Sequence, residues 1–271
     1  MKKRYIVLIL LLLVISVGIF RMRNFFRFVC IQHERPIEVM LDQLKYHDEG
    51  AFEVYIYSAN RTWKSRSVHV LNKMFADKLI LFKIPISSMR FENVTEAPIG
   101  NDSRVKFDCW FNTQYFMEDF QPCDSWKDKQ GVLGSARFEH TTVVINSNGE
   151  PHISTSATRN SSDQLFECRY THRPGKKQSL NMDNLNYRSY LAVNSDYVYY
   201  AVGYGNSLMS CRDANALMQL HGIGEWIITD GGTSIDYCFK GRQNTYQFSS
   251  IPFRSIFSKW NSPYYLGANA R

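Results

Sequence analysis

The chain has 271 residues, of which 44% are hydrophobic and 14% aromatic, so it is too apolar for a disordered chain and suits one large folded domain. Its formal net charge of +7 would suggest nucleic-acid binding, but the basic residues are unevenly placed. Residues 1–27 contain six basic residues and no acidic one, which leaves about +1 for the other 244 residues. The charge therefore belongs to membrane targeting, and we expect no nucleic-acid partner.

The N-terminal residues 1–28 have a pattern typical of a membrane-targeting signal. Residues 5–20 are almost entirely apolar and lie between two basic groups, at residues 2–4 and 21–23. As a helix they would span about 24 Å at ~1.5 Å per residue, slightly less than the hydrocarbon core of a bilayer. Because no clear small-residue cleavage site follows, we expect residues 1–28 to be an uncleaved signal anchor, with a cleaved signal peptide as the alternative.

Such a signal places the remaining chain in a lumenal, extracellular or periplasmic compartment, or in the medium if the segment is removed. Four N-x-S/T triplets follow the apolar run and agree with this placement: Asn60, Asn93, Asn101 and Asn160. The sequence also holds six cysteines, none in a C-x-x-C pair. An even number of cysteines in an exported chain favours disulfide bonds, although buried thiols remain the alternative.

Residues 29–50 are predicted to be a connector that becomes a helix. Pro36 suits a first helical position, and Gly50 would end the helix. Its apolar residues recur at helical spacing: Ile37, Met40, Leu41 and Leu44. We therefore expect the folded domain to cover residues 51–271.

Most elements predicted after residue 51 are strands. The one clear helix is Ser210–Leu220, which Gly222 would terminate. Alternating or short apolar runs bounded by turn residues predict strands at 52–57, 79–86, 104–111, 140–146, 187–193, 197–202, 226–229 and 235–239. The expected fold class is α+β: mixed, mostly antiparallel sheets with few helices, in a single domain behind an N-terminal transmembrane helix.

The sharpest chemical motif is Asp230-Gly231-Gly232-Thr233-Ser234, which follows a buried strand. A carboxylate followed by two glycines suits close approach of a ligand to the backbone, with N–H groups facing an anion. Ser234 adds a hydroxyl beside it. The motif is compatible with a sugar or phosphate ester, but the same residues also occur in ordinary turns.

The residues around this motif resemble the phosphodiester glycosidase family. The family order is an Arg that opens a strand, a second strand, a loop leading into a helix, and a strand ending in L-D-G-G-G-S. These elements correspond here to residues 188–193, 198–202, 205–208, 213–220 and 230–234, and a weaker similarity extends the match to about residues 105–245. Several glycines of the pattern are replaced: Thr113 and Gln114 stand in an upstream N-G-G-Y-F-like element, and Thr233 replaces the third glycine of the signature. Thr229 replaces the leucine before the Asp.

The resemblance implies hydrolysis of a sugar-1-phosphodiester on a glycan or glycolipid. It implies Asp230 and Arg188 as catalytic residues, the first as the carboxylate and the second as a phosphate clamp. The implied substrate-binding residues are Asn112, His140, Gly231, Gly232 and Ser234. No metal site or cofactor is expected, although Asp119, Asp124 and Asp128 could bind a divalent cation. Because of the glycine replacements, an inactive carbohydrate-binding or cell-surface interaction protein of the same fold remains the alternative.

Overall fold

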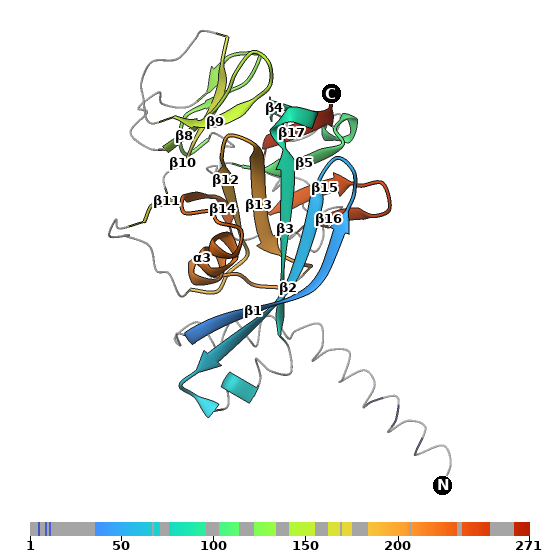
Figure 1. Cartoon of the computed structure of the whole chain (residues 1–271), viewed down its shortest axis with the longest axis vertical. Helices are drawn as coiled ribbons and strands as arrows, with labels where there is room; N and C mark the ends of the chain where they lie inside the picture. The colour runs from blue at the N-terminus through green and yellow to red at the C-terminus, as the bar shows by residue number, and fades with distance from the viewer. Residues whose placement is uncertain are drawn as a thin grey trace.

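The computed structural model describes most of the domain, in which strands predominate (Figure 1). The described residues are 36–66, 68–70, 76–95, 103–113, 122–133, 141–154, 162–168, 170–174, 184–205, 207–231, 235–249 and 263–271, with residues 5, 9 and 11. The expected anchor at 5–20 therefore lies almost wholly outside them. Among the described helices, none is long and apolar enough to cross a bilayer.

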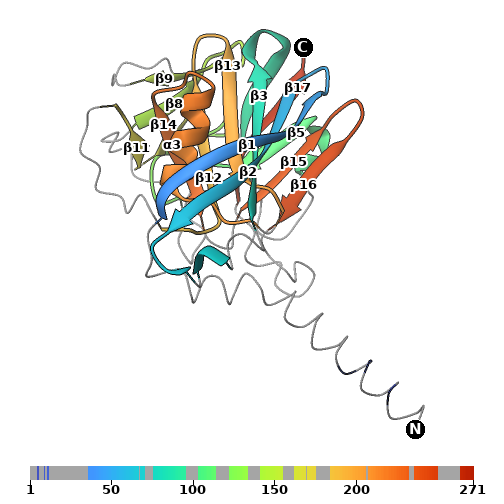
Figure 2. The same cartoon turned by 60° about the horizontal axis from the view of Figure 1, so that its bottom comes forward.

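The largest sheet has seven strands in the order β1-β2-β3-β13-β12-β14-β11. Its members are β1 (Pro36–Asp48), β2 (Glu53–Trp63), β3 (Asp77–Pro85), β11 (Thr171–His172), β12 (Arg188–Val193), β13 (Tyr197–Gly203) and β14 (Trp226–Gly231). All of its pairings are antiparallel. One face is covered by helix α3 (Cys211–Leu220), as Figure 2 shows.

Two five-stranded sheets complete the described part of the fold, in the orders β16-β15-β5-β17-β4 and β7-β6-β10-β8-β9. The first contains β4 (Met89–Thr95), β5 (Cys109–Asn112), β15 (Asp236–Lys240), β16 (Thr245–Ser249) and β17 (Tyr264–Ala270). The second contains β6 (Trp126–Lys127), β7 (Val132–Leu133), β8 (Thr141–Ile145), β9 (Pro151–Ser154) and β10 (Gln164–Cys168). The expectation of mostly antiparallel sheets with few helices is confirmed.

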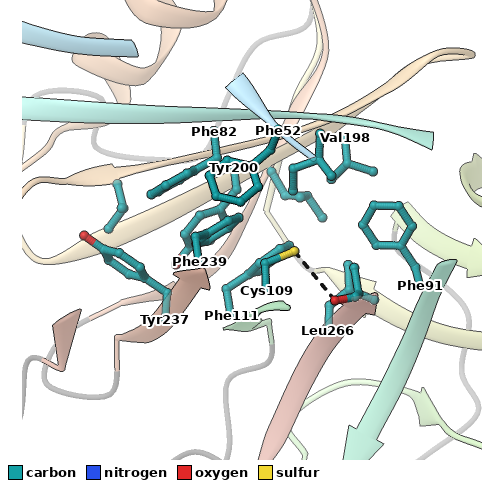
Figure 3. Close-up of a cluster of buried hydrophobic side chains, with 14 of the residues drawn as sticks. Phe52, Phe82, Phe91, Cys109, Phe111, Val198, Tyr200, Tyr237, Phe239 and Leu266 are labelled. Carbon is teal, nitrogen blue, oxygen red and sulfur yellow. Dashed lines mark hydrogen bonds between the residues drawn. The ribbon is translucent and has the colours of Figure 1, made fainter. Parts of the chain in front are cut away.

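The main core lies between the seven-stranded sheet and the two smaller sheets, and it is rich in aromatic rings (Figure 3). Phe82 of β3 stacks on Phe239 of β15 with 3.7 Å between ring centroids, and Phe111 of β5 stacks on Tyr200 of β13 at 4.1 Å. Each large ring removes extensive apolar surface from water, and each pair joins two sheets. This core fixes the positions of β12, β14 and β15 relative to one another.

The predicted helix over residues 29–50 is wrong where the structure describes it. Residues 36–48 form strand β1, which pairs with β2 across a short turn and has irregular register near residues 37 and 44. Ile37, Met40 and Leu44, which were expected on a buried helical face, are 55%, 53% and 47% exposed. Pairing with the neighbouring edge of β2 outweighs the helical spacing, because tertiary contacts override weak local preferences.

The predicted strand at 104–111 is only partly correct. A 3-10 helix covers Ser103–Lys106, and the strand β5 begins at Cys109.

The structure also changes two expectations about modification, one about glycosylation and one about disulfide bonds. Asn93 is buried in β4 and donates its amide to the Lys127 carbonyl, so it is closed to a glycan. Cys109, Cys168 and Cys211 are buried thiols, and no disulfide joins two cysteines of the described ranges.

Glu49, in the turn between β1 and β2, ties this turn to the hairpin of β15 and β16. Its carboxylate accepts hydrogen bonds from the backbone N–H groups of Gln243 and Asn244, from the Asn244 amide and from the Tyr246 hydroxyl, at 2.7–3.2 Å. Burial alone would raise the pKa of Glu49, but these four donors outweigh it and lower the pKa to about 2.

Replacing Glu49 by glutamine is expected to lower the free energy of unfolding by about 1.5–3 kcal/mol at neutral pH, because the donors lose a charged acceptor. A lowered folded-state pKa stabilises the protein above the ordinary value of 4.5, and this contribution disappears as pH falls from 4.5 towards 2. Urea unfolding should therefore show a difference between the two proteins that shrinks over this range. A constant difference would contradict the assignment, and the exposed Glu38→Gln serves as the control.

Candidate functional site

Two neighbouring strands bring the principal predicted residues together. Strand β12 begins at Arg188 and lies next to the end of β14, with Arg188 opposite Gly231 and Ser189 opposite Asp230. The buried Ile227 fixes this arrangement by packing in the main core. The backbones that carry Arg188 and Asp230 are thus adjacent.

A β-bulge in β14 lies directly before Asp230. Ser189 pairs with Asp230 but Tyr190 pairs with Ile228, so Thr229 is the extra residue. Ser189 and Thr229 are fully buried and their hydroxyls lie 2.8 Å apart. Bulges of this kind redirect the side chains that follow them and are frequent beside functional sites. The replacement of leucine by Thr229 therefore provides a hydrogen-bonded partner for Ser189.

The Arg188 side chain lies on the face covered by α3. Its Nη1 is 3.5 Å from the Sγ of Cys211, the first residue of the helix. The helix begins with a capping box in which the Ser210 hydroxyl accepts from the Asp213 N–H and Asp213 accepts from the Ser210 N–H. Burial raises the pKa of the Cys211 thiol, so this group is a neutral neighbour of the guanidinium.

A fully buried ion network holds the same end of α3. Arg61 of β2 donates to both carboxylate oxygens of Asp213 at 2.9 Å and to Asp77 of β3 at 2.5 Å. Asp77 in turn accepts from the Leu208 N–H at 3.0 Å, and Arg61 donates to the Leu208 carbonyl at 3.3 Å. The network fixes the segment before α3, and sequence reasoning missed it completely.

The segment between β13 and α3 also depends on one glycine. A Cβ atom at Gly203 would lie 2.0 Å from the carbonyl oxygen of Ser207, which is closer than any real contact. The Ser207 hydroxyl accepts from the Lys78 N–H at 3.0 Å and so anchors the same turn to β3. Only glycine permits this close approach of the two backbones.

Asn112 ends β5 and is fully buried. Its side-chain oxygen accepts from the Asp236 N–H, at the start of β15, with a distance of 2.9 Å. The Asp236 carboxylate is 2.9 Å from Nη1 of the buried Arg104, which also donates to the Tyr265 hydroxyl at 2.6 Å. Asn112 and Arg104 therefore fix the start of β15, and Arg104 is another residue that the sequence did not indicate.

The structure thus brings only some of the predicted site residues together. Arg188, Asp230 and Gly231 share one end of β12 and β14, whereas Asn112 accepts its hydrogen bond from Asp236 of β15. His140, Gly232 and Ser234 lie outside the described residues. The arrangement supplies a guanidinium next to the end of β14.

The acidic residues considered for a cation serve other contacts where they are described. Asp128 accepts from the N–H groups of Gln130 and Gly131 and from the Thr95 hydroxyl, which is a turn-forming role. Asp119 is outside the described residues. Within the described ranges, no group of three or more His, Cys, Asp or Glu side chains is suited to hold a metal ion.

No protein-family model and no curated protein sequence matches the chain. Among solved structures, a hypothetical protein from Synechocystis gives a TM-score of 0.48 at 9% identity, over 86% of this chain and 68% of that one. A protein described as exported, from Burkholderia pseudomallei K96243, gives a TM-score of 0.49 at 8% identity, over 88% of this chain and 98% of that one. A third structure is the catalytic domain of zebrafish N-acetylglucosamine-1-phosphodiester alpha-N-acetylglucosaminidase, auto-inhibited by its pro-peptide. It gives a TM-score of 0.52 at 13% identity, over 91% of this chain and 93% of that one. The chain therefore has a fold similar to that of this zebrafish catalytic domain.

Proposed function

We propose that the chain is a membrane-anchored hydrolase-like protein that acts on a sugar-1-phosphodiester of a glycan or glycolipid. The observation that carries the proposal is the position of Arg188 and Asp230 on paired strands, where Arg188 lies opposite Gly231 and the next residue, Ser189, lies opposite Asp230, in a fold similar to that of a phosphodiester glycosidase. The fold alone does not specify an activity, so the proposal depends on the residues of this site.

The chemistry follows from the two charged groups. Water adds to the anomeric carbon, the bond from this carbon to the phosphate oxygen breaks, and a phosphate monoester leaves. Asp230 would stabilise the positive charge that develops on the sugar and accept the proton of the water. Arg188 would neutralise the phosphate, because a guanidinium can donate to two of its oxygens at once. His140, Gly231, Gly232 and Ser234 are proposed to contact the substrate, whereas the buried Asn112 would act through its hydrogen bond to Asp236.

We also propose that residues 5–20 hold the domain at a membrane, with residues 51–271 on the side away from the cytosol. The sequence supports this placement through the flanking basic residues and the apolar run. Glycan and glycolipid phosphodiesters are displayed on that side, so the site would meet its substrate there.

The test is turnover of a membrane-impermeant sugar-1-phosphodiester reporter by the full-length chain in intact membrane vesicles and after detergent release. We expect Arg188→Ala to reduce kcat/KM by roughly 10²-fold and Asp230→Asn by roughly 10²- to 10⁴-fold. Arg173→Ala is a matched control, because this arginine is in a half-exposed ion pair with Glu225. Absence of turnover by the native chain would refute the enzyme and favour a sugar-binding protein of the same fold.

A further inference from the structure

Helix α3 leaves part of its face of the seven-stranded sheet uncovered. The helix ends at Leu220, and the next residue, His221, packs over the sheet. Beyond it lies a row of aromatic and charged side chains from β1, β2, β3 and β13. We define this tyrosine patch as Tyr46, Tyr55, Tyr197, His221, Glu53 and Lys83.

Three aromatic members of the tyrosine patch, Tyr46, Tyr55 and His221, form a continuous series. The ring centroids of Tyr46 and Tyr55 are 5.1 Å apart, and those of Tyr55 and His221 are 4.6 Å apart with the rings nearly perpendicular. The buried Tyr57 fixes the imidazole through a 2.9 Å hydrogen bond between its hydroxyl and Nε2. The rings are therefore held in place before any ligand arrives, which lowers the entropic cost of binding.

The patch is also accessible. Tyr46 is 50% exposed, and Tyr55, Tyr197 and His221 are half-buried. Core packing explains the inner edges of these rings, since Tyr55 and Tyr197 contact the cluster beneath α3. It does not explain why the rings of His221, Tyr55 and Tyr46 continue outward to the edge strand β1.

An opposite-charge pair lies among these rings. The Nζ of Lys83 is 2.9 Å from the Glu53 carboxylate, which also accepts a hydrogen bond from the Tyr55 hydroxyl. The same Nζ lies 4.2 Å from the centre of the Tyr197 ring. The side chains of Lys83 and Glu53 remain 20% and 27% exposed, so both can reach a bound molecule. The pair supplies donors and acceptors side by side, with no net charge.

We propose that the tyrosine patch is a binding site for a neutral carbohydrate. The C–H face of a pyranose is apolar and suits the electron-rich face of an aromatic ring. Neighbouring sugar hydroxyls can donate to the Glu53 carboxylate and accept from the Lys83 ammonium. A protein partner fits less well, because charged residues are depleted from the cores of protein interfaces, whereas Glu53 and Lys83 lie among the rings.

This site is separate from the candidate site at Arg188. Cys211, which contacts Arg188, begins α3, and His221 follows its last residue. A helix of ten residues is about 15 Å long, so the two sites lie at opposite ends of α3 on the same face of the sheet. One extended glycan could contact both, but binding at the patch does not require the proposed catalysis.

The test measures binding of four neutral trisaccharides, built from glucose in α and β linkage, mannose and N-acetylglucosamine, to the full-length chain carrying Asp230→Asn. Saturation-transfer NMR at sugar concentrations up to about 10 mM covers the weak affinities expected of such a site. At least one sugar should bind, and Tyr46→Ala and Tyr55→Ala should each weaken it about 3- to 10-fold. The matched control is Tyr204→Ala, a tyrosine that is 39% exposed and outside the patch.

Three outcomes would overturn the proposal: no sugar binds, binding is unchanged in both patch variants, or binding is lost in Arg188→Ala instead. Self-association that Tyr46→Ala abolishes, without sugar binding, would identify a protein interface. Because Tyr46 is half-exposed, its variant is expected to keep the native melting temperature, which separates lost binding from unfolding. The catalytic proposal is tested by turnover and can fail while this one holds.

Discussion

Replacing Arg61 by methionine is expected to lower the free energy of unfolding by about 3–5 kcal/mol, because two buried carboxylates lose their cation. The side chains of Arg61, Asp77 and Asp213 have no exposed surface. Methionine fills a similar volume but leaves these acids uncompensated in a medium where isolated charge is costly. For a chain of this size, the change corresponds to a drop in melting temperature of roughly 6–20 °C.

Two comparisons separate this effect from simple loss of a contact. Lys83→Met breaks an ion pair that is partly exposed, and it should cost less than about 1 kcal/mol. Adding Asp77→Asn and Asp213→Asn to the Arg61 variant should recover part of the lost stability, because the orphaned charges are removed. If the triple variant were less stable than Arg61→Met alone, the explanation by buried charge would be wrong.

Arg104→Met is the second substitution with a large expected effect, again about 3–5 kcal/mol. Arg104 is 3% exposed, pairs with the buried Asp236 and lies over the rings of Trp110 and Tyr265, 4.7 and 4.6 Å from their centres. Asp236 would remain buried without this cation, and the Tyr265 hydroxyl is a long hydrogen-bond partner at 3.5 Å. Thermal and urea unfolding measure the loss.

The Arg104 substitution should also affect the candidate site, because Asp236 begins β15, the strand that follows β14 and Asp230 in the chain. Any turnover should fall at temperatures where the variant is still folded. Arg173→Met is the control for removal of an arginine from an exposed pair. Equal loss of stability in the two variants would show that burial at Arg104 is not the cause.

Elements with local signals could be predicted from the sequence. Helix α3 has its capping box at Ser210 and Asp213, and Gly222 follows with a φ of +72°, which glycine adopts readily. The hairpin of β12 and β13 could also be predicted, because two apolar runs flank the turn residues Asn194-Ser195-Asp196. In both cases the residues that decide the structure lie within a few positions of one another.

Features that depend on distant pairing could not be predicted. The apolar residues of β1 have helical spacing, and only the partner strand β2 determines that they form a strand. The bulge at Thr229 follows from register against β12, which the local sequence does not encode. The site was therefore predicted as a set of motif residues in chain order. Its supports, Arg61, Arg104 and the Ser189–Thr229 pair, became visible only in three dimensions.

The Arg61 network also has a consequence for the order of folding. Arg61 and Asp213 are 152 positions apart, whereas Arg61 and Asp77 are separated by only 16. During synthesis the contact between Arg61 and Asp77 can form early. The contact between Arg61 and Asp213 can form only after most of the chain has been made. Contacts of such long sequence separation have a high loop-closure cost and are typical of slow folding. The network that holds α3 is thus a late closure, joining an early β2–β3 hairpin to the helix beside the candidate site.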